Sequence, residues 1–354
     1  MDKISSLQFM ALLICSKLFS VMTFIPDRNE NGATFTITVI VATALLGLLI
    51  IPALAFYKKN NGESILTFSG SKSRGLSVVI SGIYLIIALF ALIKIMGDLA
   101  FFLQYCFSDI YAPWAVIIVI AAVTFYISGL SISTLARTTG IVVTVTFIGL
   151  ALVLSGFHHH IDFIELNLAV ENPTAKILSG IPRILSDSYE LIAFVLLMQY
   201  LRKQSRLTVY GYLSVKAVII SITVLAVTLV LGNYALMTKL PFFALSAFSQ
   251  TRIIEHFEAF FMLFWTLCAI VKLVLFTQCA GICLKELFPD LKDLVGKGAV
   301  LAISSAVTIP LLVLQKWEAV KFINLQAILI VIGIFVIPLI MLVFRRRSSS
   351  EGGR

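Results

Sequence analysis

The feature that most constrains this chain is the recurrence of long apolar stretches. A helix needs about 20 consecutive apolar residues to cross the hydrocarbon core of a bilayer. The 354 residues contain ten such stretches, and hydrophobic residues make up 60% of the chain against 13% charged residues. This pattern excludes an ordinary soluble domain. It predicts an all-α polytopic membrane protein with ten spans over residues 6–25, 34–56, 76–107, 113–128, 140–157, 176–201, 208–234, 254–284, 299–314 and 322–344.

The net charge of +9 is distributed as in a membrane protein and argues against a nucleic-acid partner. The basic residues lie mostly in short segments between the apolar stretches. If both termini face the cytoplasm, sixteen of the 27 lysines and arginines lie on the inner side and six on the outer side. The positive-inside rule favours this orientation. We therefore expect one transmembrane domain over residues 1–354, in which residues 345–354 form a cytoplasmic basic tail.

The sixth predicted span, residues 176–201, contains groups that a bilayer penalises. Pro182 removes a hydrogen bond from the helical ladder. Asp187 and Glu190 are ionisable, and a charge near the bilayer centre costs roughly 2.5–3.5 kcal/mol on insertion scales. A span that retains such groups is expected to use them. The sequence thus predicts a broken helix beside a polar cavity.

Ten spans fit an inverted repeat of five plus five helices, with halves over about residues 1–157 and 176–344. In this architecture the first and sixth helices are equivalent, and their unwound segments face a solute near the bilayer midplane. The first span has a matching polar interruption at Ser16, Lys17 and Ser20. The third and eighth spans also match, because both are long and both contain charges. We therefore predict breaks in the first and the sixth helix.

The charged residues inside other spans leave alternatives open. Lys94 and Asp98 are four residues apart on one helix, so they either neutralise each other or line a solute cavity or water path. Lys272 either pairs with Asp98 or Glu190, or extends its stem to the membrane surface. Lys17 either binds a carboxylate, from a solute or from Glu190, or reaches the surface in the same way.

Catalytic and metal-binding motifs are absent from the sequence. It has no glycine-rich phosphate loop, no paired zinc motif and no nucleophile motif with a general base. His158, His159 and His160 form a run after the fifth span, but consecutive histidines rarely ligate one ion, so we expect a solvated loop. We expect a protein that is not an enzyme and that uses no cofactor or metal.

Four segments share features with a known family. The opening ISSLQFMALLI has an Ile-Ser pair and a Gln before an apolar run, and ISGLSISTLARTTGI has a Gly and an Arg at Gly129 and Arg137. The sixth span, SYELIAFVLLMQYL, contains Glu190. The segment from Leu240 to Leu273 is the most specific. In these places the chain resembles the B subunits of nutrient germinant receptors, ten-span proteins of the inner membrane of bacterial spores, and the last segment does so at Glu255, Phe257, Glu258, Ala259, Trp265 and Lys272.

That resemblance implies a fold similar to permeases of the amino acid–polyamine–organocation superfamily. It also implies an amino acid or similar small nutrient as ligand. The implied protein partners are a larger membrane A subunit and a lipoprotein C subunit, alongside membrane lipid. The chain departs from the family in its first helix, where glycine is usual and this sequence reads CSKLFS from Cys15 to Ser20.

We therefore expect a receptor subunit of the spore inner membrane that binds a nutrient between the first and sixth helices and signals germination through its partners. The alternative is an amino-acid secondary transporter of the same superfamily. The expected ligand-binding residues are Ser16, Lys17, Ser20, Asp187, Ser188, Tyr189 and Glu190, with Lys94, Asp98, Trp265 and Lys272 as cavity or coupling residues.

Overall fold

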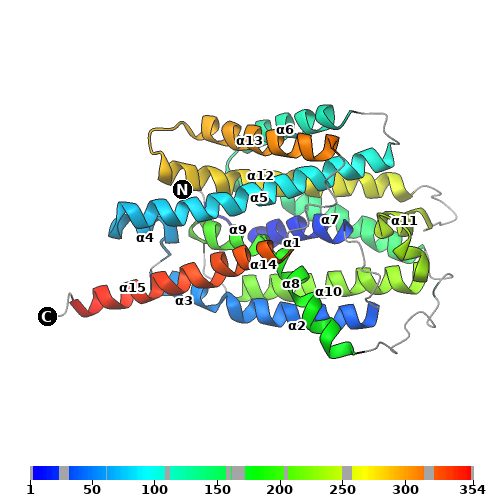
Figure 1. Cartoon of the computed structure of the whole chain (residues 1–354), viewed down its shortest axis with the longest axis horizontal. Coiled ribbons are helices and arrows are strands. Elements are labelled where there is room, and N and C mark those ends of the chain that lie inside the picture. Colours follow the sequence, from blue (N-terminus) through cyan, green and yellow to red (C-terminus); the bar gives the residue numbers. More distant parts are fainter. Residues whose placement is uncertain are drawn as a thin grey trace.

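The computed structural model describes residues 3–23, 32–60, 62–107, 112–156, 161, 172–202, 206–248, 257–314 and 323–351. Over these ranges the protein is a bundle of α-helices without β-strands, and its β-structure is one isolated bridge (Figure 1). The predicted run His158 to His160 lies outside the described residues.

The helices before the sixth predicted span follow one another with short connections. They are α1 (Ser6–Met22), α2 (Gly32–Leu49), α3 (Ile51–Lys59), α4 (Ile65–Lys72), α5 (Arg74–Cys106), α6 (Pro113–Ser128) and α7 (Ile132–Ser155).

The remaining helices include several that are interrupted or short. They are α8 (Pro173–Ser186), α9 (Glu190–Leu197), α10 (Arg206–Leu231), α11 (Pro241–Phe248), α12 (Phe257–Leu287), α13 (Asp293–Val313), α14 (Ile323–Val331) and α15 (Ile337–Glu351), with 3-10 turns at Met198–Tyr200 and Gly232–Leu236 and a π-helical turn at Ile332–Val336.

The exposed surface of the bundle is apolar, as lipid contact requires. Ile118, Ile148 and Val218 are each more than half exposed on α6, α7 and α10. Seven helical segments in the described part of the chain are long and apolar enough to cross a membrane, and three shorter apolar helices cover Ser6–Met22, Pro113–Ser128 and Glu190–Tyr200. The protein is an integral, all-α polytopic membrane protein, as predicted. The count of ten spans and the inverted repeat stay predictions.

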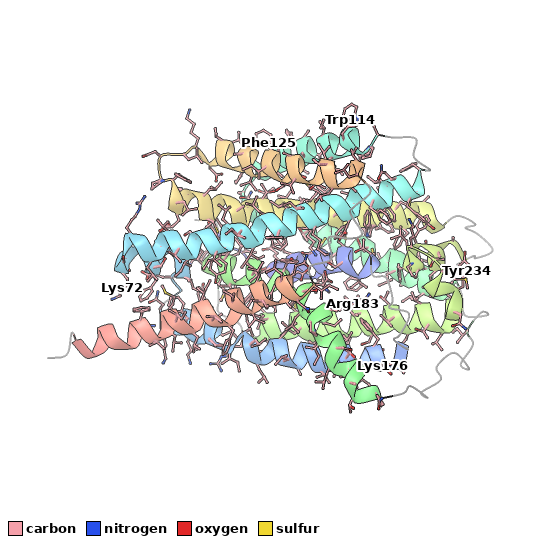
Figure 2. All side chains as sticks on the ribbon, viewed as in Figure 1. Lys72, Trp114, Phe125, Lys176, Arg183 and Tyr234 are labelled. Atoms are coloured by element: carbon pink, nitrogen blue, oxygen red, sulfur yellow. The ribbon has the colours of Figure 1, made fainter. Side chains whose placement is uncertain are left out.

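Polar and aromatic groups mark the two ends of the bundle. Figure 2 shows Lys72 at the end from which α15 projects, and Lys176 and Tyr234 toward the other end. Tyr234 and Trp114 are about half exposed, which is typical of aromatic residues at a membrane surface. Helix α15 continues past residue 345, so the predicted tail begins inside a helix that runs to Glu351.

Helix boundaries agree closely with the predicted spans where capping signals coincide with hydropathy. Helix α6 covers the predicted residues 113–128, and its first residue is Pro113. Helix α7, by contrast, begins at Ile132 rather than at residue 140. The Ser131 hydroxyl accepts a hydrogen bond from the Thr134 amide at 3.2 Å, so a side-chain cap sets the start of α7 although Arg137 follows.

The long helices α5 and α12 lie side by side and form the most extensive contact between any two described helices (Figure 1). Their contact includes Trp265, whose ring lies 3.9 Å from that of Phe102 between centroids. Helix α12 also packs on α1 and α7. The third and eighth predicted spans therefore pack along each other, whereas α8 of the broken helix packs mainly on α2 and α14.

The predicted break in the first helix is wrong. Helix α1 is continuous from Ser6 to Met22, and a capping box starts it, in which Ser5 and Gln8 exchange side-chain and backbone hydrogen bonds. Helix α1 contains no glycine or proline. Lys17 bonds to Asp187 in the break and Ser20 accepts from Lys272 of α12, so the backbone of α1 does not need to open.

The predicted break in the sixth helix is confirmed. Helix α8 ends at Ser186, α9 begins at Glu190, and the residues between them are not helical. Pro182 cannot donate to the helical ladder, which weakens the turn before the break. The Ser188 hydroxyl then donates to the Ile184 carbonyl at 2.6 Å, which satisfies a carbonyl that the ended helix leaves free.

The two halves of this broken helix differ in burial. All eight residues of α9 are buried, whereas only four of the fourteen residues of α8 are. The segment that follows α9 is paired with the N-terminal segment: Ile4 donates its amide to the Tyr200 carbonyl at 2.7 Å and accepts from the Arg202 amide at 3.0 Å. The Tyr57 hydroxyl donates to the Met198 carbonyl. Helix α9 is thus fixed in the core.

Gly333 permits close packing against α9. A Cβ atom at Gly333 would lie 2.4 Å from Ile192 Cδ1 and 3.4 Å from Tyr84 Cε1. We expect Gly333→Ala to lower the free energy of unfolding by about 1–3 kcal/mol, because overpacking moves buried side chains. Thermal unfolding in detergent would measure it. Gly82→Ala is the control, since no atom lies within 4 Å of that position and alanine favours a helix. Equal stabilities of the two variants would contradict the prediction.

Candidate functional site

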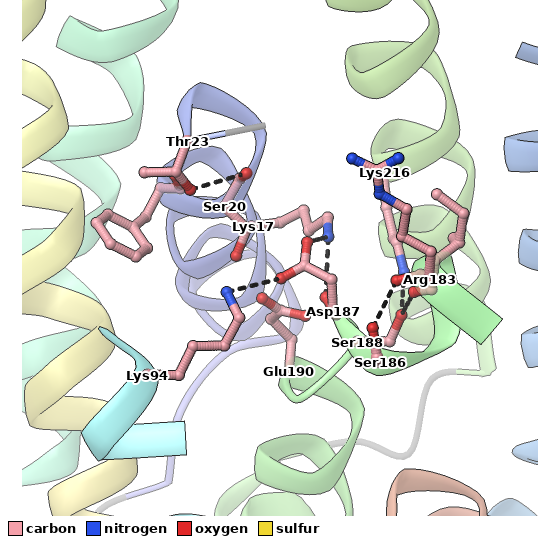
Figure 3. Close-up of polar contacts among 12 residues, drawn as sticks. Lys17, Ser20, Thr23, Lys94, Arg183, Ser186, Asp187, Ser188, Glu190 and Lys216 are labelled. Atoms are coloured by element: carbon pink, nitrogen blue, oxygen red, sulfur yellow. Dashed lines mark hydrogen bonds and ion pairs between the residues drawn. The ribbon is translucent and has the colours of Figure 1, made fainter. Parts of the chain in front are cut away.

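The break between α8 and α9 is a meeting point for charged side chains from other helices. Figure 3 shows Lys17 of α1 and Lys94 of α5 directed at Asp187. Lys17 Nζ forms an ion pair with the Asp187 carboxylate and donates to the Asp187 carbonyl at 2.9 Å. Lys94 Nζ lies 2.8 Å from Asp98 Oδ2 and 4.0 Å from Asp187 Oδ1. This side of the break is partly accessible, since the Asp187 side chain is 29% exposed.

A second ion pair lies deeper in the bundle. Lys272 Nζ of α12 is 2.9 Å from Glu190 Oε1, and the two side chains are 3% and 0% exposed. Lys272 also donates to Ser20 Oγ of α1 at 2.5 Å, and the Tyr212 hydroxyl of α10 donates to Glu190 Oε2 at 3.4 Å. Glu190 is therefore held by two helices, and Lys272 connects it to α1.

A third contact at the break comes from Lys216 of α10, which is fully buried. Its Nζ donates to Ser188 Oγ at 2.6 Å (Figure 3). Sequence reasoning missed Lys216, although the signal was present. It lies in the middle of the predicted span 208–234, where a charge is as costly as at Lys272.

We call these groups the charge network. Burying an ion costs several kcal/mol unless a counter-charge and hydrogen bonds compensate it. Each carboxylate of the network has a lysine within ion-pair distance. The network consists of Lys17, Lys94, Asp98, Asp187, Glu190, Lys216 and Lys272, contributed by α1, α5, α9, α10, α12 and the break itself.

The structure shows the partners of the charged residues whose roles the sequence left open. Lys94 and Asp98 do pair. Lys272 pairs with Glu190, so its stem does not extend to the membrane surface. Lys17 pairs with a protein carboxylate, but with Asp187 rather than with Glu190, the partner considered from the sequence. Sequence spacing identifies residues on one helix face but says nothing about which helix supplies the partner.

Three predicted site residues are buried nearby without a polar contact. Among the described residues, the Ser16 hydroxyl, the Tyr189 hydroxyl and the Trp265 indole nitrogen have no hydrogen-bond partner. The Tyr189 ring packs edge-on against Phe276, and the Trp265 ring packs between Phe19 and Phe102. The structure therefore joins Lys17, Ser20, Lys94, Asp98, Asp187, Ser188, Glu190 and Lys272, and leaves these three beside the network.

A cavity of about 160 Å³ lies elsewhere in the bundle. Its lining is almost wholly apolar and comes from α7, α11 and α12, with Met22 at the end of α1. None of the predicted site residues lines it. This cavity is therefore not the polar cavity that the sequence predicts beside the broken helix.

The interrupted helix, the buried ion pairs and the apolar outer surface together define a membrane protein of the permease-like class. A family model described as spore germination protein, Spore_permease, matches residues 3–320. The chain belongs to this family of spore germination proteins, in agreement with the resemblance of its motifs. A comparison with curated proteins finds no match.

Proposed function

We propose that the protein is a receptor subunit that binds an amino acid or similar small nutrient at the break and signals germination through partner subunits. The observation that supports this most strongly is the Lys17–Asp187 ion pair. It joins α1 to the break between α8 and α9 and leaves one carboxylate partly exposed. A solute with an ammonium group competes with Lys17 for the Asp187 carboxylate.

The exchange of partners explains how binding produces a signal. An amino acid brings an ammonium that replaces Lys17 at the Asp187 carboxylate and a carboxylate for a lysine of the network, so both ligand charges gain a protein counter-ion. The desolvation cost of the ligand is therefore small, while the ion pair between α1 and the break is lost. A ligand that binds the opened arrangement better shifts the population toward it. Partner subunits then read the new arrangement of α8.

Location and partners follow from the same proposal. Membership in a spore germination family and the orientation predicted from the basic residues support the spore inner membrane with both termini in the cytoplasm. The proposed partners are the larger membrane A subunit and the lipoprotein C subunit. Helix α15 extends beyond the other helices at the end where α3 and α4 lie, and it offers a contact surface there (Figure 1).

A secondary amino-acid transporter is the second candidate, because a broken helix beside a buried ion pair also suits alternating access. Reconstitution of the full chain in liposomes separates the two functions. With a mixture of labelled amino acids and a solute gradient, we expect saturable binding in which the retained label does not exceed the amount of protein. Accumulation beyond that amount would overturn the receptor proposal. Protein-free liposomes are the control, and absence of binding would rule out an amino-acid ligand.

A further inference from the structure

Lys216 belongs to the charge network but forms no ion pair with the described residues. Its side chain is buried on α10, and its Nζ contacts Ser188 Oγ at 2.6 Å. Ser188 directs its own proton to the Ile184 carbonyl, so its oxygen accepts from Lys216. Within the described ranges, no carboxylate lies at ion-pair distance from Lys216.

The charges of the network leave Lys216 in surplus. Lys17, Lys94 and Lys272 each pair with a different carboxylate, and the three pairs use Asp187, Asp98 and Glu190. Four lysines thus face three carboxylates. The second oxygen of Glu190 faces Tyr212, one turn from Lys216 on the same helix. A buried cation without a counter-ion is costly, which makes this position a favourable place for an anion.

We propose that Lys216 and Ser188 form the anion-binding end of the nutrient site and take the free carboxylate of the ligand; this inference rests on the proposed function. A lysine ammonium has three donors, and only one is used by Ser188. A carboxylate has two oxygens, so it can accept from Lys216 and also from Ser188 once that hydroxyl turns from Ile184.

The position of Ser188 determines the class of ligand. Ser188 follows Asp187 in the break. The same non-helical segment therefore places the Asp187 carboxylate next to the contact between Ser188 and the Lys216 ammonium. The ligand ammonium goes to Asp187 and the ligand carboxylate to Lys216. This arrangement selects small amino acids over sugars, bases and amino-acid amides, because these lack the carboxylate.

The test uses the purified full chain in lipid nanodiscs and follows its unfolding temperature. The probes are a mixture of common amino acids and the matching mixture of their carboxamides. Wild type is expected to be stabilised by the acids and not by the carboxamides. Lys216→Gln is expected to need about tenfold more amino acid for the same shift, as for loss of a bond to a charged group. Lys216→Arg keeps the charge and should stay within about threefold of wild type, a change of less than 1 kcal/mol.

Each result either supports or overturns the assignment of the ligand carboxylate to Lys216. Lys285→Gln, an exposed lysine of α12, is the control and should match wild type. If wild type ignores every amino acid, the proposed function fails and this inference fails with it. If the carboxamides stabilise wild type as well as the acids do, or Lys216→Gln responds like wild type, the Lys216 assignment is overturned while the proposed function stands. If Lys216→Gln does not fold, the comparison of acids with carboxamides on wild type decides.

Discussion

Glu190→Ala is expected to lower the free energy of unfolding by about 3–5 kcal/mol, which is enough to remove most folded protein from the membrane. The reason is the environment of Lys272. Its side chain is 3% exposed, and Glu190 is its counter-ion at 2.9 Å. Without Glu190, the Lys272 ammonium keeps Ser20 as a polar partner but loses its neutralising charge. Chemical or thermal unfolding of the detergent-solubilised protein measures the loss.

The double variant Glu190→Leu with Lys272→Met separates charge from packing. It removes both ions together, so we expect it to be more stable than Glu190→Ala and to approach wild type. Asp293→Asn is the matched control. Asp293 also pairs with a buried lysine, Lys297 at 2.6 Å, but the Asp293 side chain is 58% exposed and Lys297 keeps the Ser128 carbonyl at 3.1 Å, so a smaller cost than for Glu190→Ala is expected. A double variant as unstable as Glu190→Ala would contradict the argument.

Asp187→Asn is expected to raise the amino-acid concentration for half-maximal germination by about 30-fold or more. Removing one partner of a close charge pair costs about 2 kcal/mol or more, and 2 kcal/mol corresponds to about a 30-fold change in affinity. The variant should fold better than Glu190→Ala, because asparagine keeps the side-chain shape and an oxygen acceptor, the Asp187 side chain is 29% exposed, and Lys17 keeps its bond to the Asp187 backbone carbonyl at 2.9 Å. The measurement is the dose–response of spores that carry the variant in place of the wild-type gene.

Abundance must be followed in the same spores, since a less stable receptor also responds weakly. Immunoblots of the membrane fraction supply that measure, and Asp293→Asn serves again as an acid outside the charge network. An unchanged dose–response with normal abundance of the Asp187→Asn protein would show that the break does not bind the nutrient.

Much of this fold is predictable from local sequence. The third predicted span, residues 76–107, corresponds to α5 at Arg74–Cys106, because hydropathy is uniform over a long helix. The break after Pro182 is also predictable, since proline and two serines weaken successive turns. These signals depend on a residue and its own neighbours along the chain.

The rest depends on partners that the sequence does not specify. Ser16, Lys17 and Ser20 look like a second break, but a polar residue in a span either opens its helix or finds a partner across the bundle. Lys17 pairs with Asp187 across the bundle, and α1 is a continuous helix. The position of Lys216 inside a predicted span marks it as a charge that needs a partner, but only the packing of α10 beside the break identifies Ser188 as that partner. Helix pairing is a long-range property, and one sequence does not reveal it.

The bridge between Ile4 and the end of α9 limits how this molecule can move. The N-terminal part of the chain is bonded to the broken helix at two levels: Lys17 of α1 bonds to Asp187 in the break, and Ile4, just before α1, bonds to Tyr200 just beyond α9. If a ligand releases the first contact, the second still holds the end of the broken helix beside the start of α1. Movement at the break would then be confined to α8, and α2 and α14, on which α8 packs, would have to accommodate it. The displacement would be largest at Pro173, the residue of α8 farthest from the break.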